Sequence, residues 1–281
     1  MLIDVSTLAR HVSDPSWVVF DCRHDLFDYA KGPRLYQEGH LPGAFFAPMD
    51  TALAGEKNGR NGRHPLPRPE DFAAFLNRHG VTADTQIVAY DDVGGQYATR
   101  LWWLARWIGL TRVAALDGGL PKWTAAGQPV TSDIPAPRGA GTIVARPEFS
   151  RVVDSVTIAA ELNSGPRLVV DARAPERYRG ETEPIDPIAG HIPGAQNRFF
   201  KANLQPDLTM RPAAELRREF EALLGSRTPD QVAHQCGSGV TACVNLFAME
   251  YAGLAGSKLH AGSWSEWIAD PARPVARGPG A

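Results

Sequence analysis

An internal repeat constrains the fold of this chain more than any other feature of its sequence. Four short blocks occur twice in the same order: VVFDCR at 18–23 and LVVDAR at 168–173, GHLPGA at 39–44 and GHIPGA at 190–195, VAYDD at 88–92 and VAHQC at 232–236, and GGLPKW at 118–123 and GSWSEW at 262–267. The last two pairs share one offset of 144 residues (232 − 88 and 262 − 118). Such ordered self-similarity indicates that a whole domain has been duplicated in tandem.

Each copy alternates short strand patterns with helix patterns. Strands are predicted at 18–20, 86–90, 113–116, 168–170, 231–234 and 258–259, and helices at 69–76, 98–108, 212–224 and 240–251. Strands separated by helices favour a mainly parallel sheet that is covered by helices on both faces. We therefore expect an α/β protein of two tandem domains, residues 1–128 and 151–281. An exposed linker rich in proline and glycine is expected at 129–150.

Composition narrows the classes of function. The chain has 281 residues, with 29 basic and 31 acidic side chains, so no electrostatic attraction to nucleic acid or an anionic membrane is expected. It shows neither an apolar run of membrane-spanning length nor a signal peptide. Three cysteines without CxxC spacing do not form a disulfide framework, which favours a reducing, cytoplasmic location. No Cys/His cluster has metal-ligand spacing, so we expect neither a metal nor an organic cofactor.

The loop CGSGVTA at 236–242 lies between a predicted strand and a predicted helix. Gly237 and Gly239 let such a loop curl, so that its amides and those of Val240 and Thr241 converge on one anion at the start of the helix. This setting lowers a cysteine pKa from about 8.5 toward roughly 3.5–7.5. We therefore predict that Cys236 is a nucleophile and that these neighbours contribute to an anion-binding loop.

The two copies differ at this loop. In the alignment with an offset of 144, Asp92 stands in the first copy where Cys236 stands in the second. Ligands of open α/β sheets bind beyond the carboxyl ends of the strands, where both residues are expected. The second domain is therefore expected to perform the chemistry, and the first domain to supply a wall of the site.

With these blocks and the segment NGRHPLP at 61–67, the chain resembles the two-domain rhodanese-type sulfurtransferases over almost its entire length. The resemblance implies a cysteine persulfide on Cys236 as the intermediate. The sulfur donor would be 3-mercaptopyruvate or thiosulfate, and the acceptor a thiol or cyanide. A thioredoxin-like reductant is a further partner that the resemblance suggests.

The resemblance also implies roles for residues around the loop. The run Gly237-Ser238-Gly239 looks like the mercaptopyruvate branch of the family, in which Ser238 would belong to a hydrogen-bonded relay that polarises the substrate. The alternative is a loop hydroxyl that bonds its own backbone. In the family a histidine and an aspartate of the first domain partner this serine; His40 and Asp28 are the candidates for these places, although the local spacing differs from that of the family. A second interpretation of His40 is that it holds the turn before Pro-Gly, because His191 occupies the same motif in the second copy.

Arginines that hold the donor's carboxylate are the other feature of that branch. Arg177 matches the first of two such arginines. The second is expected after a Glu-Pro pair, but Glu183-Pro184 is followed here by Ile185 and Asp186. Arg179 either compensates for the missing arginine or is a solvated surface residue.

Two other functions share part of this sequence pattern. A cysteine-dependent phosphatase uses a related loop but needs an arginine six positions after the cysteine, where this chain has Ala242. A non-catalytic sulfur- or protein-binding regulatory module would have lost its cysteine, as the first copy has. The intact loop at Cys236 favours the enzyme.

Overall fold

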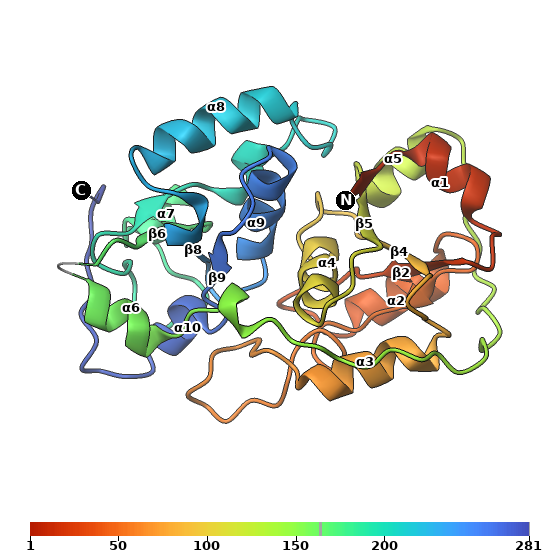
Figure 1. Ribbon diagram of the computed structural model, residues 1–281, viewed down its shortest axis with the longest axis horizontal. Helices are drawn as coiled ribbons and strands as arrows, with labels where there is room; N and C mark the ends of the chain where they lie inside the picture. The colour runs from red at the N-terminus through yellow and green to blue at the C-terminus, as the bar shows by residue number, and fades with distance from the viewer. Residues whose placement is uncertain (163–164, 281) are drawn as a thin grey trace. The chain divides into compact units, whose positions relative to one another are not determined.

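The computed structural model describes residues 1–162 and 165–280 and divides the chain into two compact units (Figure 1). Unit 1 comprises Met1–Gly55, Pro67–Glu148 and Gln205–Met210, and unit 2 comprises Glu56–Leu66, Phe149–Leu204 and Arg211–Ala281. The main boundary therefore falls between residues 148 and 149, inside the predicted linker. The predicted ranges 1–128 and 151–281 do not include one feature. Glu56–Leu66 from the first half of the sequence belongs to unit 2, and Gln205–Met210 from the second half belongs to unit 1.

Within the described residues, unit 1 contains a five-stranded sheet of order β1-β5-β4-β2-β3, and each of its ladders is parallel. Its strands are β1 (Leu2–Ile3), β2 (Trp17–Asp21), β3 (Phe45–Phe46), β4 (Gln86–Tyr90) and β5 (Val113–Leu116). Its helices are α1 (Val5–His11), α2 (Lys31–Glu38), α3 (Pro69–Arg78), α4 (Ala98–Trp107) and α5 (Gly119–Ala125). The central strands β2 and β4 are buried apolar runs, as expected for a parallel sheet covered on both faces.

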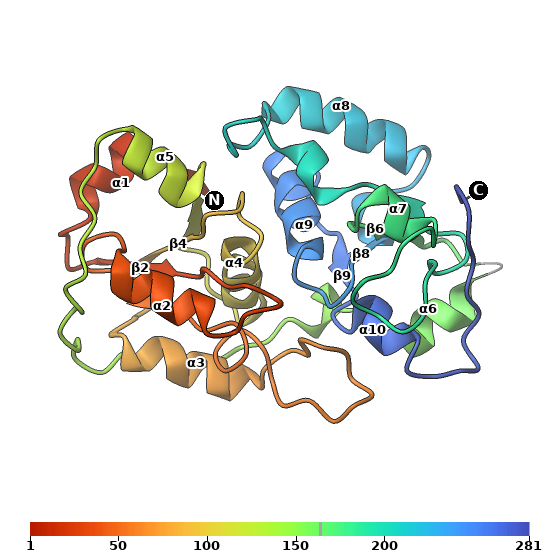
Figure 2. The same ribbon diagram turned by 180° about the vertical axis from the view of Figure 1, so that it is seen from behind.

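Helices cover both faces of this sheet. Leu8 of α1 and Trp123 of α5 form one apolar cluster with Val19 of β2, whereas Phe20, the next residue of the strand, points to the other face. There its ring lies 5.3 Å from that of Phe75 in α3. Figure 2 shows α3 on the side of the sheet opposite α1 and α5. The alternation along β2 therefore positions the two helix layers.

The described part of unit 2 has a four-stranded sheet of order β7-β6-β8-β9, again with parallel ladders. Its strands are β6 (Leu168–Asp171), β7 (Gln196–Asn197), β8 (Val232–Gln235) and β9 (Lys258–Leu259). Its helices are α6 (Ser155–Glu161), α7 (Pro175–Tyr178), α8 (Ala213–Leu224), α9 (Ala242–Tyr251) and α10 (Ser263–Trp267), with 3-10 turns η1 (Phe149–Arg151), η2 (Phe200–Asn203) and η3 (Pro229–Gln231). The predicted α/β fold with two mainly parallel sheets is confirmed.

Packing in unit 2 repeats the scheme of unit 1. Ile158 of α6 and the fully buried Trp264 and Trp267 of α10 pack against Val169 of β6. Helices α8 and α9 pack against each other, on the side of the sheet away from α6 and α10 in Figure 1. Even a helix cap is duplicated, because Asp154 accepts a hydrogen bond from Thr157 N at 2.7 Å, as Asp4 does at the start of α1. Such a cap stabilises a helix by about 1 kcal/mol.

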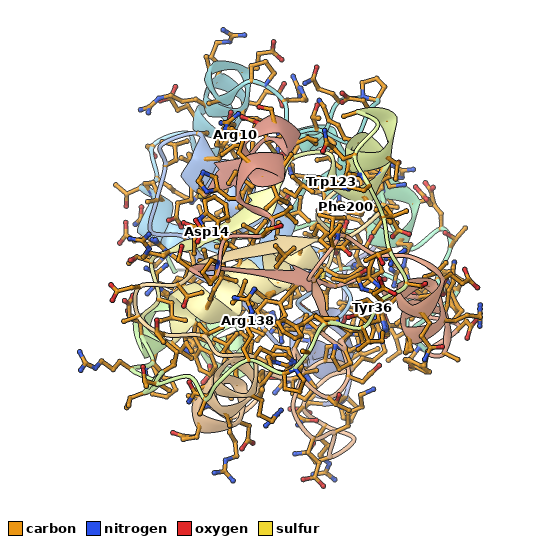
Figure 3. The ribbon with its side chains drawn as sticks, turned by 90° about the vertical axis from the view of Figure 1, so that its right-hand side faces the viewer. Arg10, Asp14, Tyr36, Trp123, Arg138 and Phe200 are labelled. Atoms are coloured by element: carbon orange, nitrogen blue, oxygen red, sulfur yellow. The ribbon has the colours of Figure 1, made fainter. Side chains whose placement is uncertain are left out.

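Residues 129–148 of the predicted linker belong to unit 1 and run along its surface. Trp123 Nε1, on the indole labelled in Figure 3, donates to the carbonyl of Pro129 at 2.8 Å. Farther along, the amide of Asn77 in α3 forms two hydrogen bonds with the backbone of Ile143, at 2.7 and 3.0 Å. A segment without regular structure still has backbone groups to satisfy, and these groups find partners along unit 1. Among the described residues, no helix is long and apolar enough to cross a membrane.

Candidate active site

Cys236 is the first residue after β8 and lies at the bottom of a tightly bonded loop in unit 2. Its sulfur accepts a hydrogen bond from Gly239 N at 3.1 Å, and its side chain is buried. The carbonyls of Cys236 and Gly237 accept from the amides of Trp264 and Ser265, both at 3.0 Å. The loop is thus anchored on α10 at its start, and an amide points at the sulfur as the sequence predicts.

Glycine is required at position 239. Its φ is +77°, a conformation that L-residues with a Cβ adopt at a cost. A Cβ at this position would lie 2.2 Å from the carbonyl oxygen of Ala261, well inside van der Waals contact. The backbone therefore passes so close to the segment before α10 that only glycine fits. This close approach aims Gly239 N at the sulfur.

Ser263 is a site residue that sequence analysis did not single out. Its φ is +54°, which is uncommon for a residue other than glycine and costs about 1–3 kcal/mol. The hydroxyl accepts from Cys236 N at 3.1 Å and donates to the carbonyl of His260 at 2.8 Å. The strained residue thereby fixes the backbone of the cysteine. The repeat held a signal for it, since its counterpart in the first copy is Gly119 with a φ of +56°.

The histidine that meets Ser238 is His64. Its Nδ1 lies 2.8 Å from Ser238 Oγ, and both side chains are buried. His64 belongs to the exchanged segment Glu56–Leu66, which is part of unit 2. That segment is fastened to α10 by Arg63 N, which donates to Ser265 Oγ at 3.0 Å. The Ser238 hydroxyl therefore bonds a histidine 174 positions away in the sequence.

His40 and Asp28 lie elsewhere, in unit 1. The ring nitrogens of His40 face the carbonyls of Tyr36 at 2.7 Å and Asp133 at 3.2 Å, and the ring stacks on Tyr36. His191 repeats this arrangement on Tyr178, so the motif histidines hold the turn in both copies. Asp28 is half exposed and pairs with Arg34 at 3.2 Å. The structure therefore replaces His40 with His64 as the partner of Ser238. One feature of the sequence distinguishes the two histidines: His40 has a histidine counterpart in the second copy, which indicates a structural role, whereas His64 has none.

Two guanidinium groups lie beside the loop next to Cys236. A Cβ placed on Gly237 would be 2.6 Å from Arg63 Nη2 and 3.7 and 3.8 Å from the terminal nitrogens of Arg177. Arg177 is one of the site residues that the sequence analysis named. Sequence analysis did not single out Arg63, although it stands beside His64 in the NGRHPLP segment. Together they place cationic hydrogen-bond donors around the residue that follows the cysteine.

Carboxylates hold both arginines. Glu183 accepts from Arg177 Nη2 at 2.7 Å, and Asp186 accepts from Arg177 Nη2 at 3.2 Å and from Arg63 Nη1. Burial raises the pKa of Asp186, with the Arg63 charge opposing the shift. Burial also acts to raise the pKa of Glu183, but hydrogen bonds from Arg177 and the backbone outweigh it, and the pKa is lowered.

The remaining predicted site residues occupy different places. Arg179 pairs with Glu181 at 2.7 Å on the surface, and this hydrogen bond raises its pKa. It therefore acts as a surface residue. Val240 is buried, Thr241 is half-buried, and both stand at the start of α9. Cys243 is buried, with its thiol 3.4 Å from the carbonyl of Gly239, and packs behind the loop.

The first copy carries a carboxylate where the second carries sulfur, but the residue is Asp91 and not Asp92. Strand register pairs Asp21 with Tyr90 and Asp171 with Gln235, so the residues that follow are Asp91 and Cys236. The loop before α4 spans 92–97, one residue longer than the loop at 237–241 before α9. This extra residue misplaces the cysteine equivalent in an alignment with a constant offset.

Asp91 fills its own loop. Its carboxylate accepts from the amides of Val93, Gly95, Tyr97 and Ala98 at 2.7–3.0 Å. Burial raises its pKa, and these four bonds oppose the shift. The amides that could face an external anion in unit 1 are therefore occupied by a side chain of the same unit.

A surface cavity of about 390 Å³ adjoins Arg63 in unit 2. Its charged lining residues are Lys57, Arg63 and Asp186, and Gly62, Ile185 and Ser265 also line it. Arg63 therefore borders both the cavity and the cysteine loop. Among residues 1–162 and 165–280, no group of three or more histidine, cysteine, aspartate or glutamate side chains is placed to hold a metal ion.

Comparison with known proteins gives consistent similarities. The family described as the rhodanese-like domain matches residues 4–126 and 156–270. A probable 3-mercaptopyruvate sulfurtransferase of Pseudomonas aeruginosa is 47% identical, with 99% of this chain and 98% of that protein covered. The putative thiosulfate sulfurtransferase SseB of Mycobacterium tuberculosis is 37% identical over 99% of this chain and 97% of its own. Among solved structures, SseA from Escherichia coli, a 3-mercaptopyruvate sulfurtransferase, superposes with a TM-score of 0.79 at 28% identity, covering 94% of this chain and 98% of that one.

Proposed function

Because this chain belongs to the rhodanese-like family and is a sulfurtransferase, we propose that it takes sulfur from 3-mercaptopyruvate onto Cys236 and passes it to a thiol. The observation that carries the choice of donor is the contact of 2.8 Å between His64 Nδ1 and Ser238 Oγ, two residues from the cysteine. A proton relay at this place serves a donor whose leaving group must gain a proton.

In the first half-reaction the Cys236 thiolate attacks the sulfur of 3-mercaptopyruvate. The new S–S bond forms as the C–S bond of the donor breaks, and its electron pair stays on carbon as the enolate of pyruvate. The proton of the donor thiol is transferred to that carbon, which yields pyruvate and the anionic persulfide. A hydrogen bond from Gly239 N, which contacts Cys236 Sγ at 3.1 Å, stabilises the negative charge of the attacking thiolate.

Ser238 and His64 would carry that proton. The hydroxyl and the imidazole can exchange a proton across their contact, and general acid–base catalysis of this kind contributes about 10²–10⁴-fold. Thiosulfate makes no such demand, because its leaving group is sulfite, which departs without a proton. The relay therefore favours 3-mercaptopyruvate over thiosulfate.

Arg177 and Arg63 would bind the carboxylate and carbonyl of the donor. Both guanidinium groups border Gly237, next to the reacting sulfur. Planar guanidinium groups bind carboxylates through paired N–H donors and so fix the orientation of the donor. Arg63 thus takes the place of the arginine that the family resemblance expects after Glu183-Pro184.

In the second half-reaction a thiol attacks the outer sulfur of the persulfide. The S–S bond to Cys236 breaks, the thiolate is regenerated, and the acceptor leaves as its own persulfide. Cyanide can act in the same way and leaves as thiocyanate. We propose a small thiol or a thioredoxin-like reductant in the cytoplasm as the acceptor, on the basis of the family's thiol acceptors.

Sulfur loading tests this function directly. The full-length protein is incubated with 3-mercaptopyruvate or thiosulfate, and its mass is measured. We expect an increase of one sulfur atom that is lost in Cys236→Ala and kept in Cys243→Ala, a matched removal of the buried thiol behind the loop. A wild-type protein that gains no sulfur from either donor contradicts the proposal. Steady-state kcat/KM for both donors tests the choice of donor, and a large preference for thiosulfate contradicts it.

A further inference from the structure

Asp186 bridges the two arginines of the site. Its Oδ1 accepts from Arg63 Nη1 and its Oδ2 from Arg177 Nη2, the latter at 3.2 Å. The Asp186 side chain is only 3% exposed, so this carboxylate is held inside the cluster and not on its rim. Asp186 also lies just after the Glu183-Pro184 pair, which the family resemblance leads one to expect to be followed by an arginine.

The arrangement leaves donors for a further anion. Among the described residues, Arg63 Nε is buried and has no hydrogen-bond partner. Asp186 engages one terminal nitrogen of each arginine, while Arg63 Nη2 and both terminal nitrogens of Arg177 face Gly237. The two guanidinium groups are therefore oriented by Asp186 from one side while they point toward the reacting loop on another.

The charges in the cluster balance. Arg63 and Arg177 contribute two positive charges, and Asp186 and Glu183 contribute two negative charges. Arg173, the third cation in contact, is itself paired with Asp171 at 2.7 Å and with Glu183 at 3.3 Å. Within these ion pairs a bound donor thus finds N–H groups in good positions but no excess of positive charge; Lys57 is a further cation on the wall of the adjoining cavity. Repulsion by the nearby carboxylate scales with the donor's charge, so a dianion is disfavoured about twice as strongly as a monoanion.

We propose that Asp186 is a specificity-determining residue, which positions Arg63 and Arg177 for a carboxylate and whose negative charge selects a singly charged donor over a doubly charged one. Such a residue favours 3-mercaptopyruvate, with one negative charge, over thiosulfate, with two. This inference rests on the proposed function. It also gives the departure from the family pattern after Glu183-Pro184 a physical meaning, because a carboxylate lies near the donor site where the family resemblance expects a cation.

Asp186→Asn tests the inference, because it removes the charge while keeping the shape of the side chain. We expect kcat/KM for thiosulfate, relative to that for 3-mercaptopyruvate, to rise about tenfold, and the gain to shrink at high ionic strength. Glu181→Gln is the matched control, since it removes an exposed carboxylate that pairs with Arg179, and it should leave the ratio unchanged. A ratio that is unchanged in Asp186→Asn, or an equal loss for both donors, overturns the inference.

A measurement on the wild-type protein covers the case in which the variant does not fold. Pyruvate and oxalate are planar and similar in size, but pyruvate carries one negative charge and oxalate two. We expect pyruvate to inhibit sulfur transfer at a lower concentration than oxalate, and tighter inhibition by oxalate overturns the inference. If the wild-type protein transfers sulfur but pyruvate does not inhibit it more tightly than oxalate, the role of Asp186 is contradicted while the proposed function stands. One that gains no sulfur contradicts the proposed function.

Discussion

Replacement of Gly239 by alanine tests how closely the active-site loop depends on the backbone behind it. Two costs add at this position. A φ of +77° costs an L-residue about 1–2 kcal/mol. The new Cβ would also lie 2.2 Å from the carbonyl oxygen of Ala261, so the loop must move by about 1 Å, and overpacking of this kind costs about 1–3 kcal/mol. We therefore expect Gly239→Ala to lower the free energy of unfolding by roughly 2–5 kcal/mol.

The same displacement moves Gly239 N away from the sulfur of Cys236, which it now contacts at 3.1 Å. We expect kcat/KM to fall at least about tenfold, the equivalent of one hydrogen bond to a charged group. Gly194→Ala is the matched control, because its φ is +76° and a Cβ there meets nothing within 4 Å. It should show the backbone cost alone and keep its activity. Denaturant unfolding and steady-state kinetics check both variants. Equal unfolding midpoints, or full activity in Gly239→Ala, would refute the close-approach argument.

Three further predictions concern side chains. His64→Ala should lower kcat with 3-mercaptopyruvate by about 10²-fold and leave thiosulfate turnover much less affected. His40→Ala should lower stability but leave the ratio of the activities with the two donors unchanged. Steady-state kinetics with each donor test both variants, and equal losses for both donors in His64→Ala would contradict the relay. Arg177→Ala should lower kcat/KM by roughly 10–100-fold, as expected for a charged hydrogen bond, and an unchanged value excludes its role in binding. Burial lowers the pKa of His234 and of His260 to about 3, below the unfolded value near 6.5. Each therefore contributes stability above pH 6.5 that is lost as the pH falls toward 3, by up to about 1.4 kcal/mol per pH unit, and unfolding free energies that stay constant between pH 7 and 4.5 would contradict this.

The sequence predicted the local parts of the site well. The strand, glycine loop and helix around Cys236 are encoded by neighbouring residues, and the repeat supplied a second copy that supported the same pattern. The strands at 86–90, 113–116 and 258–259 were predicted with the bounds that the structure has. Arg177 was predicted from the family resemblance, and the structure places its guanidinium beside Gly237.

The constant offset of 144 residues between the copies gives the wrong counterpart for Cys236. The helices α4 and α9 keep the offset of 144, but the strands before them keep 145, since Tyr90 corresponds to Gln235. One residue in a loop costs little free energy, so loop lengths drift between duplicated domains while strand register does not. Only the paired strands identified Asp91 as the counterpart of Cys236.

The sequence by itself determined that this protein is a duplicated α/β protein with a cysteine loop in its second copy, because these properties reside in periodicity and in spacings of a few residues. Its motifs also carry the resemblance to the sulfurtransferases. The tertiary structure decided which partners surround that cysteine. His64 meets Ser238 across 174 positions, and Arg63 meets Asp186 across 123. Both pairs depend on the exchange of the segment Glu56–Leu66 into unit 2. Contacts between residues so far apart are made by packing, which local patterns do not encode, so a histidine with the expected motif was predicted and a different histidine was found.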